Sequence, residues 1–351
     1  MTLGPHTVSD PRQTDRAGVG SPAVPNALPG RQILLAEDLR KSYGTHVALK
    51  SLSFGLDSGR VLGFLGPNGA GKTTSIRILT TILEPSSGRF VVDGISSDEP
   101  ELIRRRIGVL PEGLGFPKQL NGIAYLTYFG RLYGRSPGDA REVAQRLLAD
   151  VGLQQRGSSA IGTYSHGMRQ RLGIARALVN DPAVVFMDEP TLGLDPRGQR
   201  ELLALIRGIA RDRDTGVVLC SHMLSEIEGV CDDVVIMNAG EVVAAGRVAE
   251  VIGRTHVGTP HSMRVRVPDE SIPAARGVLA ALPGVGTVEV DPAGWLEVAL
   301  GPSAAGPPVE EHRIKNGILA ALIGADLPIL GFEGGGGRLE DVFLQLTEAI
   351  Q

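Results

Sequence analysis

The sequence is poor in the features that mark several large classes of protein. It holds two cysteines in 351 residues, Cys220 and Cys231, and they form no CxxC pair. We therefore expect no disulfide framework and a reduced, intracellular chain. No stretch reaches the roughly 18 uninterrupted apolar residues of a membrane helix, and the best candidate, 317–330, is interrupted by Asp326. The first residues also lack the charged-then-apolar pattern of a signal peptide.

An excess of positive charge is missing as well. The formal net charge is −4 and the sequence pI is near 6.0. Domains whose whole surface binds nucleic acid are usually strongly basic, so we do not expect that class, although a local basic patch stays open. Hydrophobic residues make up 42% of the chain, enough for a sizeable core. The length suggests two domains at roughly 150 residues each.

The chain from residue 31 to residue 252 has the pattern of an α/β domain. Residues 1–30 mix proline with glycine, serine and charges, and we expect a disordered tail there. Beyond them, short apolar runs alternate with helical segments, which indicates a mostly parallel sheet covered by helices. We expect strands at 33–44, 46–57, 59–66, 183–189 and 216–222, and helices after 66–71 and around 123–151, 167–179 and 197–212.

A second pattern begins near residue 255 and runs to residue 351. We expect strands at 261–269, 285–291, 295–300 and 328–334, and helices at 271–282, 310–325 and 339–350. The order β-α-β-β-α-β-α suits a small α+β accessory domain of ferredoxin-like type.

A glycine loop at the end of the strand 59–66 predicts a phosphate site. Gly66, Gly71, Lys72 and Thr73 satisfy G-x-x-x-x-G-K-[ST] between an apolar strand and an amphipathic helix. The glycines let successive N–H groups curl around an anion, and the helix N-terminus adds its positive end. Lys72 can reach the β- and γ-phosphates, and the Thr73 hydroxyl can ligate Mg²⁺. The alternative is a glycine-rich turn that merely starts a helix, and the strand–loop–helix context argues against it.

Two carboxylates, Asp188 and Glu189, end the buried strand 183–189. In a P-loop fold the first carboxylate holds Mg²⁺, directly or through water, and the second can orient and polarise the attacking water. Neighbouring side chains on a strand point to opposite faces, so the two need not compete for one site. A solvated acidic turn before Pro190 is the alternative, and the glycine loop upstream favours the metal site.

Residues 164–171, YSHGMRQR, open a basic helix. Arg169, Arg171 and Arg176 are spaced along it, which first suggests contact with nucleic acid phosphates. The plainer interpretation is a solvated or subunit-facing surface, as for most charge runs, and we expect that one.

Taken in their order along the chain, the motifs within residues 33–250 resemble those of ABC ATPases. GPNGAGKTT resembles Walker A, YSHGMRQRL the signature motif, VVFMDEP Walker B, GLDP the D-loop and LCSH the switch strand, which ends in His222. The resemblance implies a P-loop fold and ATP held between two head-to-tail subunits, with Walker A of one facing the signature of the other. It implies that Glu189 activates water, that His222 assists, and that Lys72 neutralises charge on the γ-phosphate. The implied nucleotide-binding positions are Tyr43, Gly66, Pro67, Asn68, Gly69, Ala70, Gly71, Lys72, Thr73, Thr74, Ser165, Gly167 and Asp195, and the implied metal ligands are Thr73, Glu112 and Asp188.

Three of the motifs carry alternatives or departures. LRKSYGTHVAL resembles the A-loop, where the family stacks an aromatic ring on adenine; an ordinary strand tyrosine is the alternative for Tyr43. The family signature is usually Leu-Ser-Gly-Gly-Gln, whereas His166 and Met168 stand here for a glycine and the glutamine. In GVLPEG, Glu112 takes the place of the Q-loop glutamine and adds negative charge beside the phosphates.

The ending GRLEDVFLQLTEAI resembles that of the ATP-binding subunits of type-2 ABC exporters, which include the daunorubicin/doxorubicin-resistance-like pumps. This resemblance implies a peripheral ATPase on the cytoplasmic face of the cell membrane. It would act as a homodimer beside a separate integral membrane permease, with ATP and Mg²⁺ and without nucleic acid. The alternatives are an importer ATPase, a soluble ABC ATPase in a non-transport process, and a non-hydrolysing ATP-gated module. Glu189 and His222 argue against the last of these.

Overall fold

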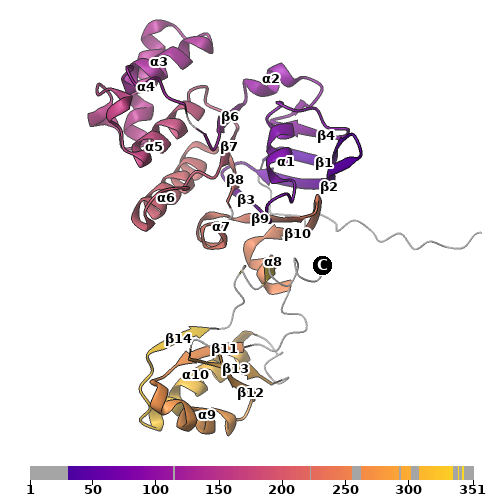
Figure 1. Ribbon diagram of the computed structural model, residues 1–351, viewed down its shortest axis with the longest axis vertical. Helices are drawn as coiled ribbons and strands as arrows, with labels where there is room; N and C mark the ends of the chain where they lie inside the picture. Colours follow the sequence, from indigo (N-terminus) through magenta and orange to yellow (C-terminus); the bar gives the residue numbers. More distant parts are fainter. Residues whose placement is uncertain are drawn as a thin grey trace, which may run out of the picture.

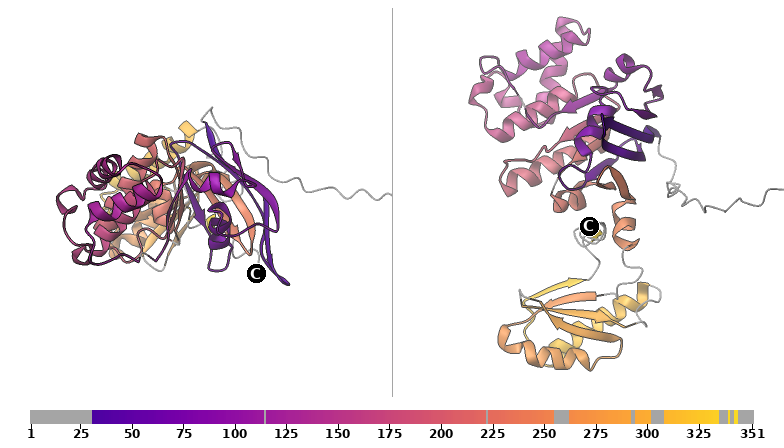
Figure 2. Two further views of the ribbon diagram at one scale, coloured as in Figure 1. Left: turned by 90° about the horizontal axis from the view of Figure 1, so that it is seen from above. Right: turned by 45° about the vertical axis from the view of Figure 1, so that its right-hand side comes forward.

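The computed structural model describes residues 31–113, 115–221, 223–254, 262–291, 294–301, 308–334, 339 and 342–343. The expected tail 1–30 lies outside them. Figures 1 and 2 show two bodies, each built on its own sheet. None of the helices among these residues is long and apolar enough to cross a membrane.

The larger sheet has a parallel centre and an antiparallel flank. Its strand order is β5-β4-β1-β2-β10-β9-β3-β8-β7-β6, and β9, β3, β8, β7 and β6 run parallel to one another, whereas β10 runs antiparallel to β9. The α/β prediction is confirmed. The described strands of this sheet are β1 (Gln32–Tyr43), β2 (His46–Asp57), β3 (Val61–Leu65), β4 (Ser87–Val92), β5 (Ile95–Ser96), β6 (Ile107–Leu110), β7 (Val184–Asp188), β8 (Gly216–Cys220), β9 (Asp233–Asn238) and β10 (Glu241–Arg247).

Helices cover this sheet on both faces. They are α1 (Lys72–Leu79), α2 (Pro100–Arg104), α3 (Gly122–Leu132), α4 (Pro137–Asp150), α5 (His166–Ala177), α6 (Pro196–Arg213), α7 (Leu224–Val230) and α8 (Val248–Arg254). The helical stretch expected around 123–151 is in fact two helices. Gly134 has a positive φ of 87°, the Ser136 side chain caps the second helix, and Pro137 occupies its first turn. These three residues stop one helix and start the next.

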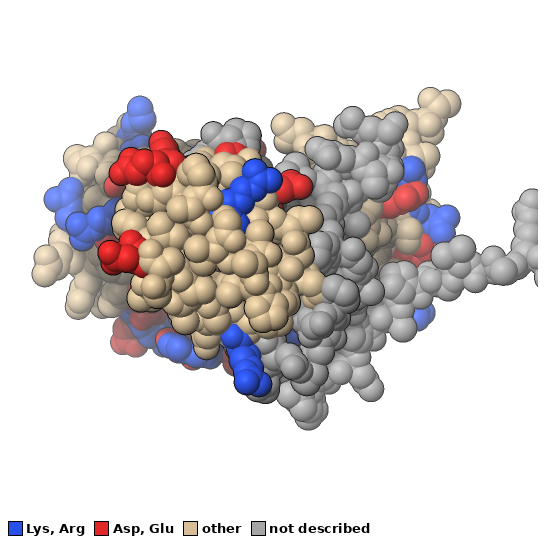
Figure 3. Space-filling view, turned by 90° about the horizontal axis from the view of Figure 1, so that it is seen from below, with Lys and Arg blue, Asp and Glu red and all other residues tan. Residues whose placement is uncertain are grey.

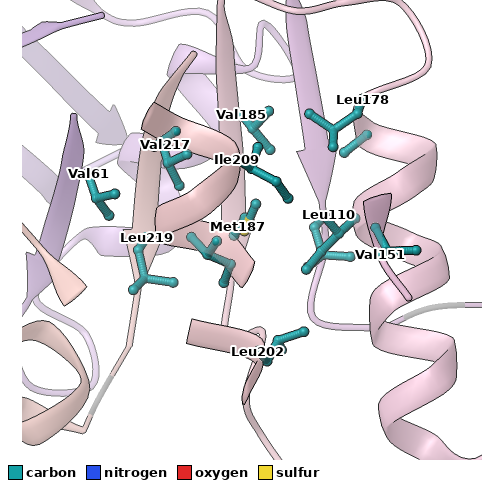
Figure 4. Packing of buried hydrophobic residues seen from close by; sticks show 14 of the residues in the cluster. Val61, Leu110, Val151, Leu178, Val185, Met187, Leu202, Ile209, Val217 and Leu219 are labelled. Carbon is teal, nitrogen blue, oxygen red and sulfur yellow. The ribbon is translucent and has the colours of Figure 1, made fainter. Parts of the chain in front are cut away.

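Side chains alternate along the central strands and so divide the core into two clusters. Val185 and Met187 of β7 face one cluster, which also holds buried residues of α4, α5 and α6 (Figure 4). Val184 and Phe186 face the other cluster, which holds the buried residues of α1. The period of two along a strand therefore assigns α5 and α1 to opposite faces of the sheet.

The smaller body is an antiparallel sheet with helices on one face. Its element order is β11 (Ser262–Arg266), α9 (Ile272–Ala280), β12 (Val285–Val290), β13 (Trp295–Leu300), α10 (Pro308–Gly324) and β14 (Gly331–Gly334). The strand order β12-β13-β11-β14 with antiparallel pairing is the ferredoxin-like arrangement that the sequence suggested. Seen from below, the described surface carries few charged side chains near its centre and more toward its rim (Figure 3).

Residues near the end of the chain return to the larger body. Leu339 and Val342 are buried in the cluster that contains Ile227, Val230 and Val251 of α7 and α8. The Leu339 N–H donates to the Glu228 carboxylate of α7. The small sheet is therefore followed by a segment that packs on the larger one.

Candidate functional site

The glycine loop joins β3 to α1, as its sequence context required. Pro67, Asn68 and Gly69 are exposed at its tip, and Lys72 opens the helix. Gly71, the N-cap residue, has a φ of +105° and offers no side chain to cap the first turn. By contrast, Ser165 and Asp195 cap α5 and α6 with their side chains. The first N–H groups of α1 are thus left for an external anion, in a loop that turns around them.

Two of the loop glycines are required by packing. A Cβ at Gly66 would lie 2.4 Å from the Met237 carbonyl oxygen of β9. A Cβ at Gly71 would lie 2.9 Å from the Ala48 carbonyl oxygen of β2. Both obstacles are backbone atoms of neighbouring strands, so a side chain at either position would displace the loop from the sheet edge.

Lys72 lies over its own loop. Its Nζ donates to the Gly66 carbonyl at 2.5 Å and to the Pro67 carbonyl at 3.2 Å. The ammonium group is therefore held above the loop by two neutral acceptors. A phosphate in the loop would offer the same group a charged acceptor, and hydrogen bonds between ionised partners are the stronger kind.

The acidic residues gather at the same edge of the sheet. Asp188 ends β7, and Glu112 follows β6, the parallel neighbour of β7. Burial raises the pKa of the Asp188 carboxyl, and the negative charge of Glu112 raises it further, whereas the charges of Lys72 and Arg77 lower it. A cation placed here would relieve the repulsion between the two carboxylates.

The donor set fits a magnesium ion that is held mainly by its substrate. No group of three or more His, Cys, Asp and Glu side chains that could hold a metal is found within the described part of the chain. Magnesium commonly takes one or two carboxylates together with phosphate oxygens and waters. Asp188, Glu112 and the exposed Thr73 on the first turn of α1 supply that kind of set.

Glu189 occupies a special backbone position just beyond β7. Its φ of +48° is unusual for a residue with a side chain. Its N–H donates to the Cys220 carbonyl of β8 at 3.0 Å. The turn and the tie to β8 set the direction in which the chain leaves the strand, and such strained positions cluster at functional sites.

The start of the signature helix is tied to the loop that follows Walker B. Ser165 caps α5 by accepting the Met168 N–H at 3.2 Å. The His166 Nε2 atom lies 2.8 Å from the Leu192 carbonyl oxygen, a hydrogen bond. The space beside Gly167 is bounded by Leu194 at 3.5 Å from a Cβ built there. His166, the departure from the family signature, therefore joins the signature to the D-loop.

The Asp195 side chain makes a capping hydrogen bond at the start of its own helix. Its Oδ1 accepts the Gly198 N–H at 3.3 Å and caps α6.

The arginines of the basic helix are not a solvated surface, and that part of the expectation was wrong. All three are half-buried. Arg169 donates to the Tyr164 carbonyl at 2.5 Å, and Arg176 donates to the Val109 carbonyl at 3.2 Å. Arg171 donates to the Val151 carbonyl and to the Glu201 carboxylate. Guanidinium groups with several donors are suited to such backbone carbonyls, so these residues join α5 to its neighbours.

The structure does not bring Ser165 and Lys72 together in one chain. The helix that Ser165 caps packs in the cluster on one face of the sheet, and α1 packs in the cluster on the other. Figure 1 shows the two helices on either side of β7 and β8. The signature motif and the phosphate loop therefore begin helices that pack on opposite faces of the sheet.

Tyr43 lies at the end of β1, in the hairpin opposite His46. The residue is 46% exposed. Lys41 lies with its Nζ 5.5 Å from the ring centroid, and the same group donates to the Glu84 carbonyl at 2.7 Å. The cation lies over the ring, and stacking of adenine on Tyr43 stays a prediction.

His222 lies outside the described residues, and its role stays a prediction. Its neighbours Ser221 and Met223 are described, and Ser221 is fully buried. Ser221 and Glu226 form a buried hydrogen bond that the motifs did not indicate. The available signal was a glutamate among the apolar residues of α7.

Comparison with known proteins decides the family. Residues 49–192 match the family described as ABC transporter. The chain is 31% identical to the linearmycin resistance ATP-binding protein LnrL of Bacillus subtilis, over 90% of this chain and 98% of that protein. It is 35% identical to the daunorubicin/doxorubicin resistance ATP-binding protein DrrA of Streptomyces peucetius, over 92% of this chain and 94% of that one.

This chain belongs to the ABC transporter ATPase family. The fold of the ABC ATPase agrees with a solved structure described as the ATP binding subunit of an ABC transporter. That structure is 30% identical, covers 64% of this chain and 94% of its own, and superposes with a TM-score of 0.57. The aligned relatives extend well past the matched domain, so the ABC ATPase and its two relatives share the C-terminal region as well.

Proposed function

We propose that this ABC ATPase is the ATP-hydrolysing subunit of an exporter and that it drives a separate membrane permease from the cytoplasmic face. The support comes from the relatives aligned over nine-tenths of the chain, which are named for resistance to linearmycin and to daunorubicin and doxorubicin. A further relative, 36% identical over 63% of this chain, is named for Nod factor export. The agreement over the C-terminal region favours export over import and over a non-transport role.

The functional unit we propose is a head-to-tail homodimer. The observation that carries it is the packing of α1 and α5 on opposite faces of one sheet. A chain with its phosphate loop on one face and its signature on the other can complete the site only with a second copy. Two-fold pairing then forms two equivalent sites at once.

We assign the roles as follows. The glycine loop and Lys72 hold the phosphates, Tyr43 stacks on adenine, and Ser165 with Gly167 of the second copy closes over the γ-phosphate. Mg²⁺, held by Asp188 and Thr73 with Glu112 nearby, would neutralise charge on the β- and γ-phosphate oxygens. Glu189 accepts a proton from the attacking water, and His222 assists. The arginines of α5 are engaged within the chain, which supports the expectation that nucleic acid is not a partner.

Two variants test these assignments. Glu189→Gln should bind ATP normally and lose turnover by about 10²–10⁴-fold, the usual contribution of a general base. Ser165→Arg should also spare ATP binding to Walker A, while its bulk blocks closure of the second copy on the γ-phosphate. ATP binding is measured by calorimetry and turnover by phosphate release. Near-normal turnover in Glu189→Gln would remove the base assignment, and near-normal turnover in Ser165→Arg would remove the intersubunit site.

The exporter assignment has its own test. The tagged chain is isolated from membranes of its own host and the co-purifying proteins are identified. A polytopic membrane protein is the expected partner. Recovery of ribosomes or DNA without a polytopic protein would contradict the transporter function.

A further inference from the structure

A buried hydrogen bond lies just past the end of β8. The Ser221 hydroxyl donates to the Glu226 Oε2 at 2.7 Å and accepts the Met223 N–H at 3.0 Å. Ser221 is 0% exposed and Glu226 is 4% exposed. One hydroxyl thus links the strand end, the first residue before α7 and a carboxylate within α7.

This link is adjacent to the Walker B carboxylates. Cys220, the residue before Ser221, pairs with Asp188 in the sheet, and its carbonyl accepts the Glu189 N–H. The chain therefore passes from a residue tied to the backbone of both Asp188 and Glu189 directly into Ser221. Position 222 is flanked on one side by this tie and on the other by Met223, whose N–H is held by the same hydroxyl.

The Ser221 hydroxyl holds the backbone where α7 begins, because it accepts the Met223 N–H. Met223 is the N-cap residue of α7 and makes no side-chain capping bond of its own. A hydroxyl group can rotate about its C–O bond. When the Ser221 hydroxyl donates its hydrogen to Glu226, its lone pairs take a fixed direction and one of them accepts the Met223 N–H. The carboxylate thus sets the orientation of the hydroxyl, and the hydroxyl sets the path of the backbone into the helix.

Burial of the Glu226 carboxylate costs free energy, because its oxygens lose their contact with water. No donor among the described atoms lies within hydrogen-bond distance of Glu226 Oε1, although that oxygen is buried. Buried polar atoms are normally satisfied, and an exception requires an explanation. A charged acceptor forms a stronger bond to a hydroxyl than a neutral one does, so the cost is consistent with a need for rigidity at this point.

We propose that Glu226 is a positioning residue for ATP hydrolysis. By holding the Ser221 hydroxyl, it fixes the backbone on both sides of His222 against the Walker B strand. The inference rests on the proposed function, because it concerns the segment that carries the expected switch histidine. Glu226 and Ser221 are both buried, and the proposal gives neither of them a contact with nucleotide.

The test compares two serines that lie four residues apart. Ser221→Ala removes the link, whereas Ser225→Ala makes the same chemical change at an exposed position of α7. Steady-state ATP turnover, the ATP dissociation constant and the melting temperature are measured on the full-length chain. Ser221→Ala should lower kcat by about 10–100-fold, the effect expected of a small misplacement near the chemistry. The ATP dissociation constant should stay at the parent value, and Ser225→Ala should match the parent in every measurement.

Variants of Glu226 separate positioning from simple stability. Glu226→Ala should lower kcat as Ser221→Ala does, and the double variant should lose no more than the larger single loss, because both remove one bond. Glu226→Gln keeps an oxygen that can accept the Ser221 hydroxyl and should recover most of the lost rate.

The possible results separate this inference from the proposed function. Equal kcat in Ser221→Ala and Ser225→Ala, with an active parent, would overturn this inference alone. So would losses in kcat that follow the melting temperature across all variants, or additive losses in the double variant. A parent chain that binds ATP without turning it over would overturn the proposed function, and this inference with it.

Discussion

A single added methyl group on β6 should disturb the signature helix. Gly108 is buried in the middle of this strand and pairs with Val185 of β7. A Cβ at Gly108 would lie 2.1 Å from the Ala177 carbonyl oxygen, whereas ordinary contact begins at 3.4 Å, so strand and helix must separate by about 1.3 Å. The obstacle is the backbone of α5, which cannot rotate away as a side chain can. Over-packing of this kind costs about 1–3 kcal/mol, and we expect the upper end for Gly108→Ala.

A glycine-to-alanine substitution in α6 provides a control that should change the free energy of unfolding in the opposite direction. Gly208 lies within α6, and the nearest atom to a Cβ there is the Asp212 Oδ2 at 3.9 Å. With no steric obstacle, Gly208→Ala should stabilise the helix by about 0.5–1 kcal/mol. The two variants carry identical chemical changes, so composition cannot account for a difference between them.

Urea unfolding followed by circular dichroism measures both effects, and phosphate release measures turnover. Gly108→Ala should unfold at a lower urea concentration than the parent, and Gly208→Ala at a higher one. Because α5 begins at the residue after Ser165, the displaced helix should also lower ATP turnover more than ATP binding. Equal midpoints for the two variants would refute the close approach of β6 to α5 on which the prediction depends.

Three further predictions concern other parts of the molecule. Burial and the charge of Glu112 raise the pKa of Asp188 above its ordinary value of 3.8, so ionisation of this carboxyl opposes folding. The free energy of unfolding should therefore fall as the pH rises from 3.8 through the raised pKa of the folded protein. Asp188→Asn should melt at a higher temperature than the parent at neutral pH and should lose turnover. Leu339→Ala should lower the free energy of unfolding by about 2–5 kcal/mol, because Leu339 is 0% exposed and lies in the core of the larger body. Ile323→Ala is the control: this residue is 67% exposed, and the same urea titration should show a change of less than about 0.5 kcal/mol. Tyr43→Ala should weaken ATP binding by about 10-fold in calorimetry, Tyr43→Phe should retain it, and equal affinity in all three proteins would exclude stacking.

The features that depend on a short stretch of sequence could be predicted from the sequence alone. The glycine loop and the α/β class follow from spacing and periodicity within short windows, and the structure places the loop between β3 and α1 as expected. The split of 123–151 into two helices was missed, although Gly134 and Ser136-Pro137 were visible signals for it. The apolar periodicity continued across that break and outweighed it.

The candidate site was only partly accessible in the same way. Asp188 and Glu189 were predicted because they stand at the end of a buried strand in a chain with a recognisable glycine loop, and the structure places Asp188 at the end of β7. The roles of Arg171 and Arg176 were misjudged because their partners, Val109, Val151 and Glu201, lie 67, 20 and 30 residues away along the chain. The Ser221–Glu226 bond was missed because burial of a polar pair depends on what packs over it.

The sequence by itself determined the chemistry of the half-sites: a phosphate loop, two carboxylates and a serine-capped helix. Each is set by a few consecutive residues, because backbone turns, caps and strand ends are local properties. Only the tertiary structure decided that α1 and α5 pack on opposite faces of the sheet. That outcome depends on how each helix crosses the sheet and on which alternate side chains of β7 and β8 it covers. The proposal of a second copy that completes the site rests on this packing.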